Sequence, residues 1–284
     1  MRMRSEVFDW NEEGAADGVG HPLRAMALGI VALGAWMREN PAKALAFGEE
    51  SLRLERETDS TRSVPARMAL MNSAEYGGEA VDVRALMIEM LQITRESSSP
   101  YMQVNADGMR LLSMAFAGRV DQAVDLSTVV MKTARDADNP STLAWAMFVK
   151  GVAVEGVDVD HAEALFEDAL ERARSVDNGW IGAMCGTRLA SLRRRRGGWA
   201  DALSLLVELL DTWERAGHRA HLWGAIHQVA LCRAESGDLQ HAAMLHEASN
   251  SSAMRTPKLP VERADDAACL ERARASVDAS EWRR

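Results

Sequence analysis

The stretch Asp160-His-Ala-Glu-Ala-Leu-Phe-Glu-Asp-Ala-Leu-Glu-Arg-Ala173 decides the fold of this chain. Within it, Ala162, Phe166 and Ala169 stand four and then three residues apart, a spacing that places them on one face of a helix. Acidic residues and an arginine fall on the other face. The small residues let a second helix approach closely, and the phenyl ring fills the space between them. The stretch therefore predicts a helix that packs tightly against a neighbouring helix.

The same unit recurs along the chain at a nearly constant interval. An alanine stands early in the second helix of five predicted helical pairs, at Ala44, Ala123, Ala162, Ala202 and Ala242. Successive alanines are 79, 39, 40 and 40 residues apart. The first gap therefore holds two repeats, and we expect the missing member near Arg84 or Ala85.

Glycines mark the turns inside these pairs. Gly118, Gly197 and Gly237 each stand five residues before the alanine of their repeat. Glycine accepts the positive φ that ends a helix and reverses the chain. No stretch of useful length shows the alternation of a β-strand. Two helices in each unit of about 40 residues predict an α-solenoid, a right-handed superhelix with a concave and a convex side.

We therefore predict an all-α fold, an α-α superhelix of about six helical hairpins followed by a C-terminal closing helix. Three parts are expected: an irregular N-terminal segment over 1–20, helical repeats over 21–255, and a linker with the closing helix over 256–284. The expected helices cover residues 22–39, 41–58, 65–76, 81–95, 101–117, 120–137, 141–154, 158–176, 180–195, 199–216, 219–235, 239–251 and 261–276.

Composition narrows the classes of protein further. Of the 284 residues 47% are hydrophobic and only 5% aromatic, which favours closely packed helices over a β-sandwich. The net charge of -9 and pI near 5.4 argue against a nucleic-acid binder, which usually carries a basic face. The longest apolar run, 25–37, is too short to span a bilayer. Three scattered cysteines indicate a reducing compartment. We expect a cytoplasmic protein without a membrane or nucleic-acid partner.

The second helices resemble the tetratricopeptide repeat, in which an alanine, an aromatic residue or leucine, and another alanine follow one another. The residues Ala162, Phe166 and Ala169 match this pattern. The set that begins at Ala202 matches it in part, and the set that begins at Ala123 matches it poorly beyond that alanine. The period exceeds the family's usual length of about 34 residues. The chain is thus similar to the longer-period variety of tetratricopeptide-like repeats.

That variety occurs in the C-terminal helical regions of large bacterial signalling ATPases of the STAND class, some of which also carry cyclase-type or DNA-binding domains. The segments 21–36 and 235–248 resemble those regions, and the resemblance covers roughly residues 21–276. The phosphate-binding loop of those ATPases is absent, because none of the four lysines follows a glycine. The resemblance implies a sensor or scaffold without the ATPase, as a stand-alone relative or a truncated part of a larger regulator.

The sharpest charge run is Arg193 to Arg196. It ends a predicted helix, where cations complement the helix dipole, so we interpret it as a solvated helix end. Contact with an anion or an acidic peptide is the alternative, because arginine binds carboxylates with two parallel hydrogen bonds. The adjacent acids Asp265 and Asp266 point apart on a helix and are interpreted as solvated surface.

Five histidines cluster late in the chain, at His218, His221, His227, His241 and His246. A zinc site needs ligands that converge from one face, often as HExxH, and this motif is absent. We expect packing or capping roles for these histidines, with His227 the best placed to face a ligand. No metal and no cofactor are predicted.

Four tryptophans fall in adjacent repeats, at Trp180, Trp199, Trp213 and Trp223. Their rings are expected to fill gaps between the repeats. The alternative is a groove lined with aromatic rings that would hold a peptide or a small ligand.

The predicted role is recognition of a protein or peptide by a non-catalytic scaffold in bacterial signalling or transcriptional regulation. The alternative is a domain that senses a small-molecule effector for a regulator whose ATPase or cyclase output lies outside this chain. In related repeat proteins the first helix of each pair lines the concave surface. Registry with the alanines places these candidates there: Asn105, Thr187, Ser191, Arg194 and His227. We expect Arg194→Glu to weaken partner binding and to leave folding intact.

Overall fold

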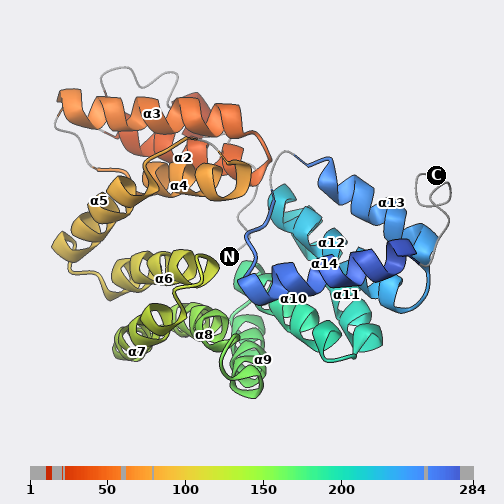
Figure 1. Cartoon of the computed structure of the whole chain (residues 1–284). Coiled ribbons are helices and arrows are strands. Elements are labelled where there is room, and N and C mark those ends of the chain that lie inside the picture. Colours follow the sequence, from red (N-terminus) through yellow and green to blue (C-terminus); the bar gives the residue numbers. More distant parts are fainter. Residues whose placement is uncertain are drawn as a thin grey trace.

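The chain folds into a succession of helices (Figure 1), seen in a computed structural model that describes residues 11–14, 21, 23–58, 62–78, 80–252 and 255–275. No strand occurs among these residues. The helices are α2 (Arg24–Met37), α3 (Pro41–Thr58), α4 (Val64–Gly77), α5 (Val83–Glu96), α6 (Pro100–Phe116), α7 (Val120–Asp136), α8 (Pro140–Val154), α9 (Val159–Ser175), α10 (Gly179–Arg195), α11 (Trp199–Ala216), α12 (Arg219–Glu235), α13 (Leu239–Asn250) and α14 (Pro260–Ala275).

The helices pair into six hairpins that stack in the order of the sequence, from α2 with α3 to α12 with α13. The predicted all-α superhelix of about six hairpins and a closing helix is confirmed, and the observed helix ends differ from the expected ones by at most a few residues. Residues 11–14, within the segment expected to be irregular, are helical, and the rest of 1–20 lies outside the described residues. Across the described ranges, no helix is both long and apolar enough to cross a membrane.

The turns between hairpins repeat one local design. A residue with positive φ, then a capping residue, then the first helical residue follow one another at Ser98-Ser99-Pro100 and at Asp138-Asn139-Pro140. The side chains of Ser99 and Asn139 accept hydrogen bonds from backbone N–H groups of the first helical turn, which would otherwise lack a partner. This regularity gives successive hairpins similar starting geometry.

All five repeat alanines are buried without any exposed surface. In each repeat, the N–H of this residue donates to the carbonyl of the residue that precedes the second helix, as Ala162 does to Asp158. The N–H of Leu86 donates in the same way to the carbonyl of Asp82, which precedes α5. Leu86 is therefore the missing member of the series. This residue is next to Ala85 and so lies near the expected position, although Arg84 and Ala85 themselves are exposed. Leucine occupies the buried position that alanine holds elsewhere.

Close approach of the two helices of a hairpin depends on glycine in the first helix. A Cβ atom at Gly151 of α8 would lie 2.5 Å from the ring of Phe166 in α9. At Gly186 of α10, it would lie 2.7 Å from a methyl group of Leu209 in α11. Phe166 itself has no exposed surface. The ring expected to fill the space between helices therefore does so directly against the backbone of the partner helix.

The superhelix curves until its first two hairpins meet the sixth. Trp36 of α2 lies edge-on to His218, before α12, with ring centroids 4.8 Å apart. The hydroxyl of Tyr76 in α4 is 3.4 Å from Nε2 of His221 in α12. The indole N–H of Trp223 donates to Glu39 over 3.0 Å. We call this junction the closure seam, and it joins segments more than 140 residues apart in the sequence.

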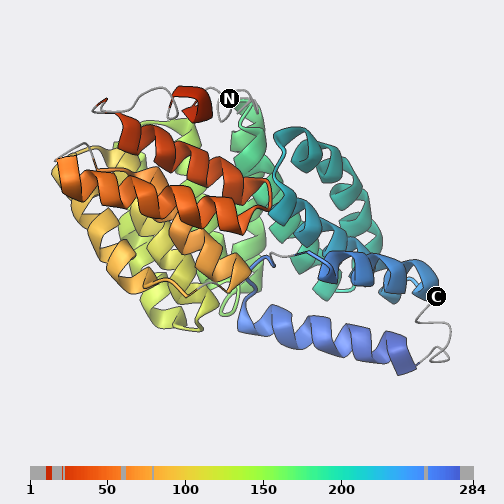
Figure 2. The ribbon, with the colours of Figure 1, turned by 90° about the horizontal axis from the view of Figure 1, so that it is seen from above.

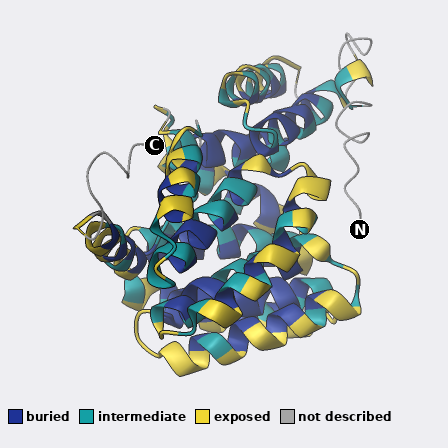
Figure 3. Ribbon diagram, turned by 90° about the vertical axis from the view of Figure 1, so that its right-hand side faces the viewer, coloured by how far each residue is buried: buried dark blue, intermediate teal, exposed yellow. Residues whose placement is uncertain are grey.

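Burial follows the stacking: Figure 3 shows buried residues where helices lie against one another and exposed residues along the outer parts of the ribbon. The largest apolar cluster extends from α6 to α10 and includes Trp145, Phe148 and Phe166. The closing helix α14 lies outside this cluster, at the edge of the molecule (Figure 2). It packs mainly on α12.

Candidate binding surface under the closing helix

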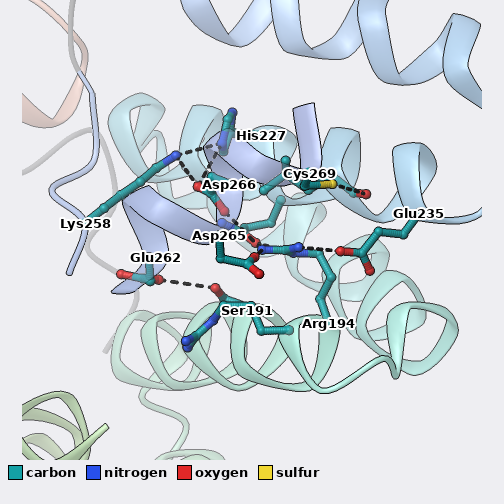
Figure 4. Close-up of polar contacts among 12 residues, drawn as sticks. Ser191, Arg194, His227, Glu235, Lys258, Glu262, Asp265, Asp266 and Cys269 are labelled. Carbon is teal, nitrogen blue, oxygen red and sulfur yellow. Dashed lines mark hydrogen bonds and ion pairs between the residues drawn. The ribbon is translucent and has the colours of Figure 1, made fainter. Parts of the chain in front are cut away.

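One face of α10 carries three polar side chains that point toward α14, namely Arg188, Ser191 and Arg194. Their spacing of three residues keeps them on the same side of the helix. Figure 4 shows Ser191 and Arg194 beneath α14, with Glu262, Asp265 and Asp266 of that helix above. We call the surface formed by α10 and α12 beneath α14 the inner polar surface.

Arg194 is the centre of this surface, and its side chain has no exposed area. Its Nη1 donates to Glu235 of α12 over 2.6 Å, and its Nη2 donates to Asp265 over 2.7 Å and to Asp266 over 3.0 Å. Nε donates to Gln228 of α12 over 3.3 Å. Burial disfavours the charge of Arg194, but the surrounding carboxylates outweigh it and raise the pKa. All three nitrogens of the guanidinium are therefore in use.

A second charged cluster lies one to two turns earlier along α10. Arg188 donates to Glu262 of α14 over 2.6 Å and to Glu155, at the end of α8, over 2.9 Å. Arg195 also contacts Glu155. Glu262 accepts further bonds from the Ser191 hydroxyl over 3.2 Å and from a backbone N–H over 2.8 Å. Arg188 and this N–H overcome the effect of burial on Glu262 and lower its pKa.

Asp266 connects the closing helix to α12 and to the linker before it. Nζ of Lys258 donates to the carboxylate over 2.6 Å, and Nε2 of His227 lies 3.2 Å from the same oxygen. Although burial opposes its charge, these two neighbours lower the pKa of Asp266 to about 2. The pKa of His227 is lowered by burial. At neutral pH, Asp266 is thus an ionised, buried carboxylate.

Three of the five predicted concave-surface residues, Ser191, Arg194 and His227, come together in this cluster. The other two lie elsewhere. Asn105 is half-buried on α6 and donates to the carbonyl of Tyr101 in its own helix. Thr187 accepts a hydrogen bond from the Trp213 indole over 3.3 Å and so faces α11.

The interpretation of Arg193 to Arg196 as a solvated helix end was wrong for its two middle members. Arg194 is fully buried, and the side chain of Arg195 is 11% exposed, because α14 and Glu155 cover them. The outer members fit the interpretation better, with Arg196 46% exposed. The interpretation of Asp265 and Asp266 as solvated surface was also wrong, since Asp266 is buried and both carboxylates contact Arg194.

Six further residues of the cluster were missed from the sequence: Glu155, Arg188, Gln228, Glu235, Lys258 and Glu262. A signal for part of it was present. Arg188 and Arg194 share a face of one predicted helix, and Glu262 and Asp266 share a face of another. A basic face on one helix and an acidic face on another predict contact between the two helices. The prediction holds only if the chain brings α14 back across α10.

The remaining candidate groups have structural partners. His218 and His221 pack in the closure seam against Trp36 and Trp213, in agreement with the expected packing role. All three cysteines are buried, and burial raises the pKa of Cys232 to about 12 and that of Cys269 to about 11. Burial disfavours the reactive thiolate. Among the described residues, no group of three or more His, Cys, Asp or Glu side chains could hold a metal ion.

Trp213 is fully buried, whereas Trp180, Trp199 and Trp223 are partly exposed. Two hollows in the described part of the chain have volumes of about 130 and 250 Å³. The larger lies between the end of α9, the start of α10 and the end of α11. Both are smaller than the roughly 300–1,000 Å³ of most small-ligand sites.

Comparison with known proteins gives little further guidance. No protein-family model and no curated protein matches the chain. Among solved structures, that of BtubC (BKLC) from P. vanneervenii is similar over 92% of this chain and 89% of that chain, with 14% sequence identity and a TM-score of 0.47. A likeness at this level does not bear on function.

Proposed function

We propose that this protein is a non-catalytic helical-repeat scaffold that recognises a protein or peptide with the concave surface of its first helices, of which the inner polar surface is one part. The observation that carries the proposal is the docking of α14. A helix that is separate from the six hairpins lies on α10 and α12, where its carboxylates bond to Arg188 and Arg194 of α10 and to His227 of α12. A surface with this chemistry suits an acidic peptide segment.

The architecture supports the same role. Solenoids present extended surfaces on which a partner can lie along several repeats. The resemblance of the second helices to tetratricopeptide repeats supports a peptide-binding role, and the resemblance to STAND-class regulators suggests bacterial signalling or transcriptional regulation in the cytoplasm as its setting. The carboxylates of the inner polar surface are occupied by arginines, as Glu155 is by Arg188 and Arg195, which favours recognition over acid–base chemistry.

Site-directed crosslinking in the native host tests this proposal. A photoreactive residue is placed at Asn105 or His227, on first helices, and in a control protein at Ser204, which is exposed on the second helix α11. A specific partner is expected to crosslink from the first-helix positions and to be displaced by excess unmodified protein. Equal crosslinking from Ser204, or no saturable crosslink from either first helix, would contradict the proposal.

The small-molecule alternative predicts a different result. A sensor needs an enclosed pocket with a few converging polar groups, and neither hollow described above has the usual volume. A thermal-shift screen against cellular metabolites addresses it directly. One metabolite that raises the melting temperature in a saturable way would favour the sensor over the scaffold.

A further inference from the structure

The closing helix is attached by charge more than by apolar contact. Among the side chains of α14 whose burial is described, the buried ones form one narrow stripe, Glu262, Asp266, Cys269 and Ala273, at intervals of four, three and four residues. Two of these four side chains are carboxylates. By contrast, α8 buries eleven residues along its length, and α10 buries ten. Because apolar burial supplies most of the stability of a docked helix, α14 is expected to open more readily than the repeats.

The position of α14 also differs from that of another repeat. Within the stack, each first helix packs against the second helix of the hairpin before it, as α10 packs on α9 and α12 on α11. A seventh hairpin would begin with a helix on α13. Instead α14 packs mainly on α12, and its carboxylates reach α10. The helix therefore lies across the first helices, where a solenoid would hold a ligand.

We infer that α14 occupies the site of an acidic helix from a partner protein, which replaces α14 by presenting carboxylates at the same spacing. This inference rests on the proposed function and specifies its partner. The required pattern can be read from α14: acids at the positions of Glu262, Asp265 and Asp266, then small side chains at those of Cys269 and Ala273. The partner segment is a helix with acids at i, i+3 and i+4 and small residues at i+7 and i+11.

The charges beneath α14 favour a peptide over a nucleic acid. Without the carboxylates of α14, the surface presents Arg188, Arg194 and Arg195. Two carboxylates, Glu155 and Glu235, lie between and beside these arginines. A continuous phosphate backbone would meet them as like charges, whereas separate carboxylates on a helix can each face an arginine.

Because α14 is covalently linked to the repeats, its effective concentration determines the affinity that a partner helix needs to replace it. The linker brings α14 back after few residues, and the backbone N–H of Arg255 is fixed to the Tyr76 carbonyl over 2.8 Å. A segment held on so short a tether competes at an effective concentration of about 1 mM or more. The intact protein is therefore expected to bind an outside helix weakly, and loosening α14 should uncover the site.

A labelled peptide tests the exchange. A fluorescent synthetic peptide with the sequence of residues 257–275 serves as the acidic helix, and its binding is measured by anisotropy to the full chain, wild type and Glu262→Gln/Asp266→Asn. The variant should bind it about tenfold more tightly or better, because its own α14 no longer competes. The chain with Glu271→Gln, an exposed acid of α14, is the matched control and should bind like the wild type.

A peptide with Gln and Asn at the positions of Glu262 and Asp266 should not bind the double variant measurably. Binding of the unmodified peptide to neither chain would overturn the inference. So would equal competition by a single-stranded oligonucleotide, since that would make the site a general anion surface. Circular dichroism and thermal melting establish that the double variant retains its folded repeats.

Hydrogen exchange of the wild type gives a second test that needs no variant. Amides of residues 263–275 should exchange through a local opening, at least about tenfold faster than the slowest amides of α10. Exchange of α14 only together with α10 would show that the helix does not detach, and would overturn the inference. If α14 stays closed while a partner still crosslinks at Asn105, the scaffold function stands and only the replacement of α14 is wrong.

Discussion

Arg194 and Asp266 lie 3.0 Å apart across the boundary between α10 and α14, and neither side chain is more than 6% exposed. The arginine belongs to the repeats and the aspartate to the closing helix, so this pair joins two parts of the chain 72 residues apart. Glu235 and Asp265 share the same guanidinium. One buried cation thus supplies two of the ion pairs that dock α14, beside the pair of Arg188 with Glu262.

Replacing Arg194 by glutamate should undock α14. The new carboxylate would face Glu235, Asp265 and Asp266, and breaking a buried ion pair costs about 3–5 kcal/mol. Opening of α14 relieves much of this cost by returning the acids to water. Faster hydrogen exchange over 263–275, with smaller changes in α6 to α9, is the expected result. The expectation from the sequence that this substitution leaves folding intact does not fit the burial of Arg194.

Arg196→Glu is the control for this substitution, since it changes the same charge two residues later. Arg196 is 46% exposed and pairs with Asp160 and Glu163 on the outer surface. Exposed ion pairs contribute little, so exchange in α14 should match the wild type. If Arg194→Glu and Arg196→Glu open α14 to the same extent, the helix is held by the net charge of the repeats and not by the buried contact of Arg194 with its acids.

The repeats could be predicted from the sequence because each depends on local signals. The alanines, the turn glycines and the capping residues lie within one hairpin, and Ala162 and Gly197 behave as their patterns indicate. Contacts between distant hairpins carry no such signal. Trp36 and His218 meet only because the superhelix curves back on itself, an outcome of small rotations summed over six hairpins.

The candidate site was predicted in part for the same reason. Registry with the alanines grouped Ser191, Arg194 and His227, and these side chains do lie together beneath α14, because the first helices follow the period of the repeat. The burial of Arg194 could not be predicted, since it depends on where the linker returns α14. A charge run at a helix end looks the same in a sequence whether water or another helix covers it.

Gly151→Ala should destabilise the protein, although alanine favours helix formation by about 1 kcal/mol over glycine. The new methyl group would lie 2.5 Å from the fully buried ring of Phe166, and overpacking of this kind costs about 1–3 kcal/mol. We expect a net loss measured by thermal or urea unfolding. Gly156→Ala, where nothing lies within 4 Å of the added atom, is the matched control and should melt near the wild type.

A partial rescue checks the cause of that loss. Combining Gly151→Ala with Phe166→Leu replaces the ring that the new methyl group would meet by a smaller side chain. The double variant should lose less stability than the sum of the two single variants, by about 0.5 kcal/mol or more, since residues in contact couple. Additive losses would mean that the contact between Gly151 and Phe166 is not the source.

The closure seam should weaken as the pH falls below about 6.5. Burial lowers the pKa of His221 to about 3, and burial together with His221 lowers that of His218. Unfolded histidines bind protons near pH 6.5. Below this value the unfolded state therefore holds more protons than the folded state, and the free energy of unfolding decreases as the pH decreases. The slope approaches about 1.4 kcal/mol per pH unit for each histidine, and it vanishes above pH 7.

The groups around this pair do not offset the effect. Trp36 from α2 and Trp213 from α11 are uncharged, and the Tyr76 hydroxyl from α4 stays protonated because burial raises its pKa. Buried His227, whose pKa is also lowered, adds to the slope of the whole protein. Asp266, with a pKa of about 2, does not titrate between pH 7 and 5.

Urea unfolding between pH 7.5 and 5 measures the slope, and His221→Phe should lower it by up to about 1.4 kcal/mol per pH unit. Hydrogen exchange locates the effect: amides of α2, α4 and α12 should lose protection before those of α8 and α9, which lie far from the seam along the superhelix. The substitution His241→Phe, at a histidine whose side chain is 61% exposed, is the control and should leave the location of the early exchange unchanged. An unaltered slope in the His221→Phe variant would show that this histidine is not buried in its neutral form, and that the first and sixth hairpins do not close against it.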